Sequence, residues 1–383
     1  MASAFLIPLL CVFFVGFSAA QTTTDFLSAS NPWVLWGGRY GVDPDGSVAF
    51  DWEGTTATFV VTGMDATVTM WTNITLEASN SARVSVYVNG YDAANLMLHN
   101  STPSYLLASS LPVASNTLTI QYAFEPGSSG ASRSNLRTPG IFGFNVGNGG
   151  AFAAPTPLTK RIDIIGDSIT AGSMYDKLES VNGPLSLGTG CNPWSPVTGY
   201  SQTFNWETYL CRYFKANCTT IAWSGGVLVD PSVSKCPPRA YLPQLYTQTF
   251  ATGTELWDFS ATSRPDLIII YLGTNDYSCA NMTDALFTAA YGALLANITR
   301  YYSASPGPAT TQFLLTIGPM APIRPLAALN TAIAAANAAG IKASLLDMRN
   351  ATLDGCGSHP GPIGHWQMAL KAAPQIKAVM GWT

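Results

Sequence analysis

The pattern of hydrophobic residues changes near residue 150, and this change limits the fold that each half of the chain can adopt. Before it, short β-rich runs alternate with turn residues, and no long helical period appears. Short strands of this kind predict an antiparallel sandwich or jelly roll. We expect strands at residues 47–52, 57–62, 66–71, 83–88, 117–123 and 140–146.

After residue 157, apolar strand patterns alternate with helical ones, which predicts a parallel sheet covered on both faces. The glycine-rich residues 147–150 and the prolines that follow predict a linker at 151–157, between a sandwich domain at 21–150 and an α/β domain at 158–383. We expect strands at residues 161–165, 219–223, 267–271, 312–317 and 342–346, and helices at 201–216, 284–302, 325–339 and 362–380.

The first 20 residues have the pattern of a secretory signal peptide. Residues 6–17 form an apolar run too short to cross a membrane, and Ser18, Ala19 and Ala20 supply small residues at a cleavage site. The alternative, a buried N-terminal helix, would show an amphipathic period that this run lacks. No later run of 18 apolar residues occurs, so we expect a secreted protein without a stable membrane anchor.

Charge and cysteine content narrow the classes of partner. Charged residues make up 10% of the chain, the formal net charge is −4 and no basic cluster occurs, which argues against a nucleic-acid partner. Cys11 lies in the predicted leader, and the spacing of the other six cysteines is not that of a zinc site. Six cysteines allow 15 connectivities. We expect the pairs Cys191–Cys236, Cys211–Cys218 and Cys279–Cys356, and candidate glycosylation sites at Asn73, Asn100, Asn217, Asn281, Asn297 and Asn350.

The motif Gly166-Asp167-Ser168-Ile169-Thr170 follows the first predicted strand of the α/β domain. Groups at the carboxyl ends of parallel strands face the crevice where ligands bind. Ser168 is therefore a candidate nucleophile, with its amide at a helix N-terminus and Asp167 bracing the turn. The alternative is an ordinary turn with a helix cap.

A serine nucleophile needs a base, and the chain has three histidines. His359, in Gly357-Ser358-His359-Pro360, lies in a loop just before the last predicted helix and is the candidate base. His365 lies one turn into that helix, where we expect a packing or capping role. His99, beside the sequon at Asn100, is expected at the surface.

Two further turns follow predicted strands of the same sheet. Asn275, in Gly273-Thr274-Asn275-Asp276, can aim its amide at a developing oxyanion, or it can cap a helix. Gly225, in Ser224-Gly225-Gly226, allows a backbone N–H to approach a ligand closely, although glycine after a strand is common.

In this order, the turns of Ser168, Gly225, Asn275 and His359 resemble the SGNH (GDSL-type) hydrolase superfamily over most of residues 160–370. With a sandwich in front, the chain is similar to carbohydrate esterase family 2, which are secreted acetylesterases of polysaccharides and sugars. The resemblance implies a flavodoxin-like parallel-sheet hydrolase domain behind an all-β jelly-roll sandwich. It also implies an oxyanion hole built from the amides of Ser168 and Gly225 and the side chain of Asn275.

The chain departs from the superfamily at one position. Most members have an aspartate three residues before the histidine, where this chain has Cys356, and Asp354 lies two residues further upstream. Some members of carbohydrate esterase family 2 use a Ser–His dyad in which a backbone carbonyl orients the imidazole. We expect such a dyad here, with the Gly357 carbonyl in that role, in a monomer that uses no metal or organic cofactor.

The sequence is also compatible with two other functions. A lipid acyl hydrolase would share the same core residues and differ only in its acyl pocket. A secreted glycan-binding protein without activity would use exposed aromatic side chains to stack on sugars. Its candidates in the sandwich are Trp33, Trp36, Tyr40 and Trp52, although aromatic residues at such positions more often belong to a core.

Overall fold

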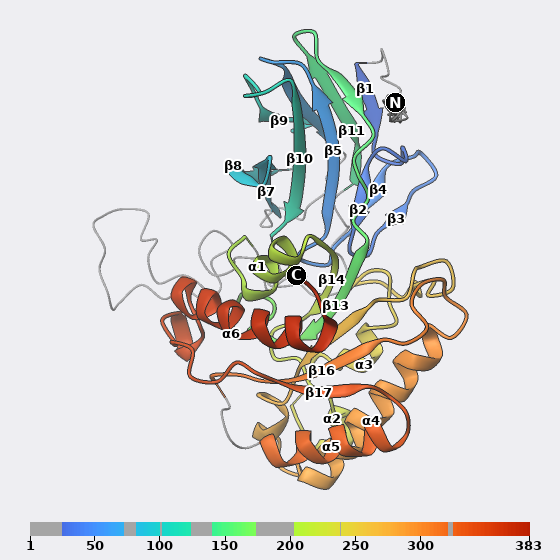
Figure 1. The fold of residues 1–383 in the computed structure, drawn as a ribbon, viewed down its shortest axis with the longest axis vertical. Helices are drawn as coiled ribbons and strands as arrows, with labels where there is room; N and C mark the ends of the chain where they lie inside the picture. Colours follow the sequence, from blue (N-terminus) through green and yellow to red (C-terminus); the bar gives the residue numbers. More distant parts are fainter. Residues whose placement is uncertain are drawn as a thin grey trace, which may run out of the picture.

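The computed structural model describes residues 25–72, 82–99, 102–123, 140–173, 203–237, 239–320 and 325–383. It contains a β-sandwich that stands on one side of an α/β domain (Figure 1). The predicted leader, Cys191 and the sequons at Asn73 and Asn100 lie outside these residues.

Within the described residues, the sandwich consists of two six-stranded antiparallel sheets. Buried residues alternate with partly exposed ones along the strands, and the buried side chains of both sheets form one core that includes Phe59, Phe144 and Phe152. The first sheet contains β1 (Phe26–Ser28), β3 (Gly41–Val42), β4 (Val48–Ala49), β6 (Thr67–Thr72), β9 (Ser104–Ala108) and β11 (Gly140–Gly147). The second contains β2 (Leu35–Gly37), β5 (Thr56–Thr62), β7 (Ala82–Val88), β8 (Tyr91–Leu98), β10 (Ser115–Tyr122) and β12 (Ala151–Ala153).

Each of the six expected strands corresponds to an observed one, and the structure adds β1, β2, β3, β8, β9 and β12. Strand β12 falls inside the expected linker and pairs with β5, so the sandwich continues to Ala153. It was missed because only Phe152 of its three residues is buried, which is too short a run to show a period of two.

The α/β domain is built on a parallel sheet with the order β14-β13-β15-β16-β17. The strands are β13 (Lys160–Gly166), β14 (Ala216–Ala222), β15 (Leu267–Tyr271), β16 (Gln312–Ile317) and β17 (Ala343–Asp347). Numbered within the domain, this order is 2-1-3-4-5, the flavodoxin-like order that the resemblance implied. The order reverses between β13 and β15, so the crevice at their carboxyl ends is the expected ligand site.

Helices cover both faces of this sheet, as predicted. One face packs on α1 (Trp206–Phe214) and α6 (Pro362–Met380), and the other on α3 (Leu242–Leu245), α4 (Asp284–Tyr301) and α5 (Leu326–Ala338). Along β15, Leu267 and Ile269 face α1 and α6, whereas Ile268 and Ile270 face α4 and α5. The short helices α2 (Pro231–Ser234), η1 (Asp276–Ser278) and η2 (Cys356–Ser358) lie in the connecting segments.

The sandwich is joined to the α/β domain by buried side chains. Trp52 is fully buried in the apolar cluster of the α/β domain. The guanidinium of Arg39 donates to the carbonyls of Tyr246 and Gln248 at 2.5 and 2.7 Å. The carboxylate of Asp51 accepts from the backbone N–H groups of Ala251 and Thr252 at 2.8 and 3.1 Å and from the Thr252 hydroxyl at 2.9 Å. The sandwich is therefore part of the folded unit that carries the α/β sheet.

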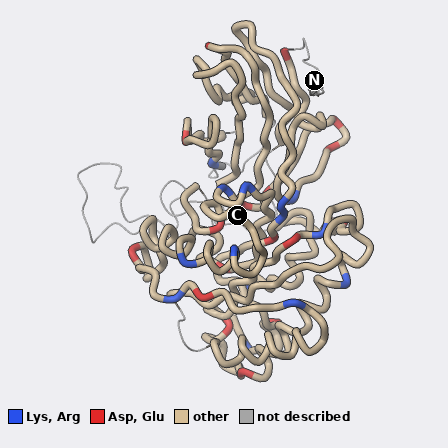
Figure 2. Tube along the Cα trace, viewed as in Figure 1, with Lys and Arg blue, Asp and Glu red and all other residues tan. Residues whose placement is uncertain are grey.

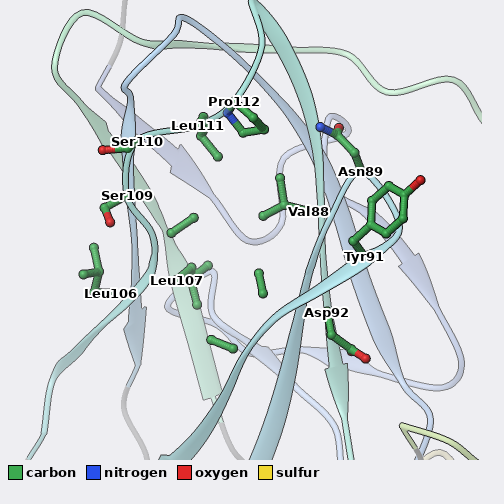
Figure 3. A pocket seen from close by; sticks show the side chains of 13 residues that line it. Val88, Asn89, Tyr91, Asp92, Leu106, Leu107, Ser109, Ser110, Leu111 and Pro112 are labelled. Atoms are coloured by element: carbon green, nitrogen blue, oxygen red, sulfur yellow. The ribbon is translucent and has the colours of Figure 1, made fainter.

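Charged residues are sparse along the trace, and acidic and basic positions are interspersed (Figure 2). In the part of the chain that the structure describes, no helix is both long and apolar enough to span a bilayer. A groove of about 590 Å³ opens between β8 and β9 in the sandwich, lined in part by Val88, Tyr91, Leu107 and Leu111 (Figure 3). None of the candidate site residues borders it.

Candidate active site

Ser168 and His359 meet at the carboxyl end of the parallel sheet. Ser168 follows β13, and His359 lies between η2 and α6. The Ser168 Oγ and the His359 Nε2 are 2.9 Å apart, which is hydrogen-bonding distance. Each of the two residues is only 8% exposed. Residues 191 positions apart in the chain thus form the pair that nucleophilic catalysis requires.

The turn that carries Ser168 is held on several sides. The Asp167 carboxylate accepts from the Ile169 N–H at 3.1 Å, so Asp167 braces the turn as expected. A Cβ atom on Gly166 would overlap the Thr170 side chain, which explains why glycine precedes the Asp-Ser pair. The Asn205 side chain caps α1 and donates to the Thr170 carbonyl at 2.5 Å, so the turn is fastened to the first helix.

The loop before α6 is shaped so that a backbone carbonyl reaches the imidazole. Gly357 and Ser358 both adopt left-handed conformations, with φ of 56° and 60°. For Ser358 this conformation costs on the order of 1 kcal/mol. The His359 Nδ1 lies 3.2 Å from the Gly357 carbonyl oxygen. When Nδ1–H donates to that carbonyl, the lone pair of Nε2 faces the Ser168 hydroxyl.

Asp354 is occupied elsewhere. Its carboxylate accepts from the N–H groups of Gly361, Ile363 and Gly364 at 2.9, 3.0 and 2.9 Å, and so caps the N-terminus of α6. Across the described ranges, the hydrogen-bond partner of the His359 Nδ1 is the Gly357 carbonyl rather than a carboxylate. This geometry is the one a Ser–His dyad requires.

Donors for an oxyanion lie beside the serine. Among the described residues, the N–H groups of Ser168 and Gly225 donate to no protein acceptor. Gly225 has a φ of 75° in a turn closed by the Gly226 N–H and the Trp223 carbonyl at 2.8 Å. The Asn275 Nδ2 lies 3.1 Å from the Gly226 carbonyl and 3.3 Å from Asp167 Oδ2. Because both its N–H donors already have acceptors, Asn275 must share one of them with a substrate oxygen to act in an oxyanion hole.

Burial shifts the pKa of each titratable group of the site toward its neutral form. Desolvation raises the pKa of Asp167 to about 7 and that of Asp276 to about 6. Desolvation also lowers the pKa of His359 below its usual 6.5, although the Gly357 carbonyl partly opposes this shift. His359 is thus predominantly neutral near pH 7, as a general base must be.

Two residues that hold the Asn275 turn in place, Asp276 and Arg239, were not assigned a role from the sequence. Asp276 accepts from the N–H groups of Leu228 and Val229, both at 2.9 Å, and so ties the turn to the segment after Gly225. Its place in the Gly273-Thr274-Asn275-Asp276 motif was a usable signal. Arg239 donates to the Asn275 Oδ1 at 3.0 Å, and no motif around it marks this contact.

The other two histidines lie where expected. His365 is fully buried, and its Nδ1 faces the Trp206 N–H at 3.4 Å. Burial lowers the pKa of His365 to about 3, so it packs as a neutral ring. His99 is exposed at the end of β8.

The disulfide pattern corrects part of the sequence prediction. Cys211 pairs with Cys218, as expected. Cys236 pairs with Cys279, so the expected pairs Cys191–Cys236 and Cys279–Cys356 are both wrong. Sequence spacing could not reveal this pairing, because the α2 segment and the Asn275 turn approach each other only in the folded sheet.

The described sequons differ in their surroundings. Asn281 and Asn350 are exposed and Asn297 is partly exposed, whereas the Asn217 Nδ2 faces the Trp36 carbonyl at 3.4 Å at the contact between the domains. Within the described ranges no group of three or more His, Cys, Asp or Glu side chains could hold a metal ion.

The aromatic residues proposed to stack on sugars are buried or partly buried. Trp52 is fully buried, and Trp33, Trp36 and Tyr40 are partly buried against the sandwich core.

Solved structures of carbohydrate esterases share this two-domain fold. A family two carbohydrate esterase from Clostridium thermocellum, in complex with cellohexaose, superposes with a TM-score of 0.72 and 23% identity over 91% of this chain and all of that chain. The acetyl xylan esterase Est2A from Butyrivibrio proteoclasticus gives a TM-score of 0.73 and 19% identity over 94% of this chain and all of that one. At these identities the likeness shows a common fold.

Sequence comparison places the chain in a family. Cellulase/esterase CelE from Acetivibrio thermocellus is 25% identical over 274 residues, which are 71% of this chain and 30% of that protein's length. The family model for GDSL-like lipase/acylhydrolase matches residues 162–371, more than half of the chain and the segment that contains Ser168, Gly225, Asn275 and His359. The chain therefore belongs to the GDSL-like lipase/acylhydrolase family.

Proposed function

We propose that the protein is a secreted serine esterase that removes O-acetyl groups from polysaccharides or sugars through an acyl-enzyme. The observation that carries the proposal is the 2.9 Å contact between Ser168 Oγ and His359 Nε2. Beside it, the backbone N–H groups of Ser168 and Gly225 have no acceptor among the described residues. A nucleophile, a base and oxyanion donors at one point are the minimum set for acyl transfer.

The proposed reaction has two halves. His359 takes the proton of the Ser168 hydroxyl as the serine oxygen attacks the ester carbonyl, and the oxyanion is held by the amides of Ser168 and Gly225 and by Asn275. His359 then protonates the departing sugar hydroxyl, which leaves an acetyl-serine. A water molecule deprotonated by His359 attacks that ester, and His359 then returns the proton to the Ser168 oxygen as acetic acid leaves, which restores the free serine.

The Gly357 carbonyl supports a dyad rather than a triad in this proposal. It can select the Nδ1–H tautomer of His359, but it stabilises the imidazolium less than a carboxylate would. Burial of His359 favours the neutral ring that begins each half-reaction.

The choice of acetylated carbohydrate rests on relatives. Similar solved structures include an acetyl xylan esterase and a family two carbohydrate esterase bound to cellohexaose, and the shared sandwich extends the likeness beyond the hydrolase sheet. Export is supported by the apolar leader and by the Cys211–Cys218 and Cys236–Cys279 disulfides, which persist in oxidising compartments. The family name also covers lipases, so a lipid acyl hydrolase is the second candidate.

Acetate release tests the proposal. Acetylated xylan, glucomannan and cello-oligosaccharides would be incubated with wild-type protein and with Ser168→Ala, and hydrolysis of 4-nitrophenyl acetate and 4-nitrophenyl palmitate would be compared. We expect acetate from at least one glycan, preference for the acetyl ester and no turnover by Ser168→Ala. Preference for palmitate would support the lipid hydrolase instead, and glycan binding without acetate release would support a binding protein.

A further inference from the structure

We propose that Arg239 is a positioning residue that fixes the side-chain amide of Asn275 in the orientation that an oxyanion hole needs. This inference rests on the proposed function, because it takes the Asn275 amide as an oxyanion donor. Its direct evidence is the contact between the Arg239 Nη1 and the Asn275 Oδ1 at 3.0 Å.

The two ends of the Asn275 amide face groups of opposite kind. Oδ1 accepts from the Arg239 guanidinium, while Nδ2 donates to the Gly226 carbonyl and to Asp167 Oδ2. If the amide rotated by 180°, its N–H₂ group would face a cation and its oxygen would face two oxygen atoms. Arg239 therefore makes the inverted rotamer unfavourable and keeps the N–H donors on the side of the Ser168 turn.

Arg239 also holds the backbone of the same turn. Its Nη2 donates to the Ser278 Oγ at 3.3 Å, and the Ser278 hydroxyl donates to the Asn275 carbonyl at 2.6 Å. The planar guanidinium reaches the side chain of Asn275 and the far end of η1 at the same time. A lysine ammonium carries the charge but cannot reproduce this two-point geometry.

A disulfide fastens the segment of Arg239 to the turn that it contacts. Cys236 lies three residues before Arg239, and its partner Cys279 directly follows Ser278. The Asn281 N–H donates to the Ser234 carbonyl at 3.1 Å, beyond the disulfide. The arginine is thus delivered by a covalently joined pair of loops, which reduces the entropy lost when its hydrogen bonds form.

The contact also alters the charge distribution of the donor. A cation on the amide oxygen polarises the Asn275 side chain and strengthens its N–H groups as donors. Arg239 is only partly buried, and its guanidinium also favours the ionised form of Asp276 in the same turn. We expect the benefit to appear when negative charge develops on the substrate oxygen, and therefore in kcat rather than in KM.

The test is a double-mutant cycle on acetyl ester hydrolysis with Arg239→Met, Asn275→Ala and both together. Loss of a whole oxyanion donor costs about 10²- to 10³-fold in kcat, so we expect Asn275→Ala in that range and Arg239→Met at about 10- to 100-fold, with KM nearly unchanged. In the Asn275→Ala background, Arg239→Met should cost nothing further. Arg300→Met is the matched control, because Arg300 donates to Asn297 on α4 in a similar Arg–Asn contact.

Chemical rescue separates positioning from folding. Ethylguanidinium, at concentrations far below those that unfold the protein, should restore part of the kcat of Arg239→Ala and none of that of Asn275→Ala. Arg239→Lys should retain less than half of the wild-type kcat despite its charge.

Three results would overturn the inference: an unchanged kcat in Arg239→Met, an equal further loss in the Asn275→Ala background, or no rescue of a folded Arg239→Ala. Ser168→Ala, assayed in parallel, distinguishes these results from failure of the proposed function. Retained turnover there removes the serine mechanism, whereas loss of turnover there with an unaffected Arg239→Met removes only the role of Arg239.

Discussion

Two buried polar clusters of this molecule, one around Asp51 and one around Ser168, differ in whether their hydrogen-bond donors have acceptors. At the contact between the domains, the carboxylate of Asp51 accepts three donors from Ala251 and Thr252. At the carboxyl end of the sheet, the N–H groups of Ser168 and Gly225 have no protein acceptor among the described residues. The hydrogen bonds of the first cluster stabilise the fold, whereas the N–H groups of the second are available to a bound ligand.

Two arginines, Arg39 at the contact between the domains and Arg239 beside the Asn275 turn, also differ in their surroundings. The Arg39 guanidinium is fully buried, packs over the rings of Tyr246, Trp257 and Phe259, and donates to backbone carbonyls. Arg239 is partly exposed and donates to side chains of the Asn275 turn. The same side chain therefore serves architecture in one cluster and, on our proposal, positions a catalytic group in the other.

The largest expected effect comes from Ser168→Ala. Removing the nucleophile should lower kcat by about 10⁴-fold or more, because the remaining site retains only its binding and oxyanion contributions. The free energy of unfolding should stay close to that of the wild type, since within the described ranges the Oγ forms its hydrogen bond with His359 alone. Ester hydrolysis and urea unfolding would be measured on the same preparation. If Ser168→Ala lost stability together with activity, the Ser168 cluster would contribute to the stability of the fold as well as to catalysis.

Asp51→Ala should show the opposite pattern. It removes the carboxylate that accepts from the buried Ala251 N–H and from the partly buried Thr252 N–H and hydroxyl, which costs about 2–4 kcal/mol of unfolding free energy. The kcat of the folded fraction should be unchanged. Asp92→Ala, which removes an exposed carboxylate of the same domain, is the control and should leave the denaturation midpoint unchanged. A fall in kcat for Asp51→Ala would show that the two clusters are coupled.

The two disulfides that join described residues to each other sharpen the same comparison. Loop-closure entropy predicts a loss of about 4 kcal/mol for Cys236→Ser/Cys279→Ser and about 2.5 kcal/mol for Cys211→Ser/Cys218→Ser, because they close loops of sequence separation 43 and 7. Only the first variant should also lower kcat, since only that bridge lies beside the Asn275 turn. Equal kcat values in the two variants would contradict the positioning role of the Cys236 loop.

The smallest expected effect is on the pH profile. His359 must be neutral to accept the serine proton, and burial lowers its pKa, so kcat/KM should fall only below pH 6.5. Protonation below that pKa removes the base, so activity rises with pH through it. An acidic limb with its midpoint well above 6.5 would indicate a carboxylate partner that stabilises the imidazolium, and would argue against the dyad.

Much of the α/β domain follows from local patterns. Strands β15 and β16 and helix α6 begin and end at the predicted residues, because continuous apolar runs and terminal prolines or glycines mark their limits. The sandwich was less predictable: β1, β2 and β3 have only two or three residues each, too few to show a period, and they are stabilised by pairing with distant strands.

Some residues of the candidate site could likewise be predicted from local sequence patterns, and others could not. Ser168, Asn275 and His359 were predicted because each follows a recognisable element in a turn of characteristic composition. Arg239 and the Cys236–Cys279 pair were not, because their roles depend on the approach of two loops that no sequence spacing encodes. The Gly357 carbonyl could be anticipated only from the absence of an aspartate at position 356.

The most direct test of the central claim is to trap the acyl-enzyme. Wild-type protein, Ser168→Ala and His359→Ala would be mixed with 4-nitrophenyl acetate, quenched in acid and digested for peptide mass spectrometry. The account predicts one acetyl group on the Ser168 peptide of the wild type and none on that peptide in either variant. Continued hydrolysis with no acetyl group on Ser168, or acetylation of Ser168 that is undiminished in His359→Ala, would contradict it.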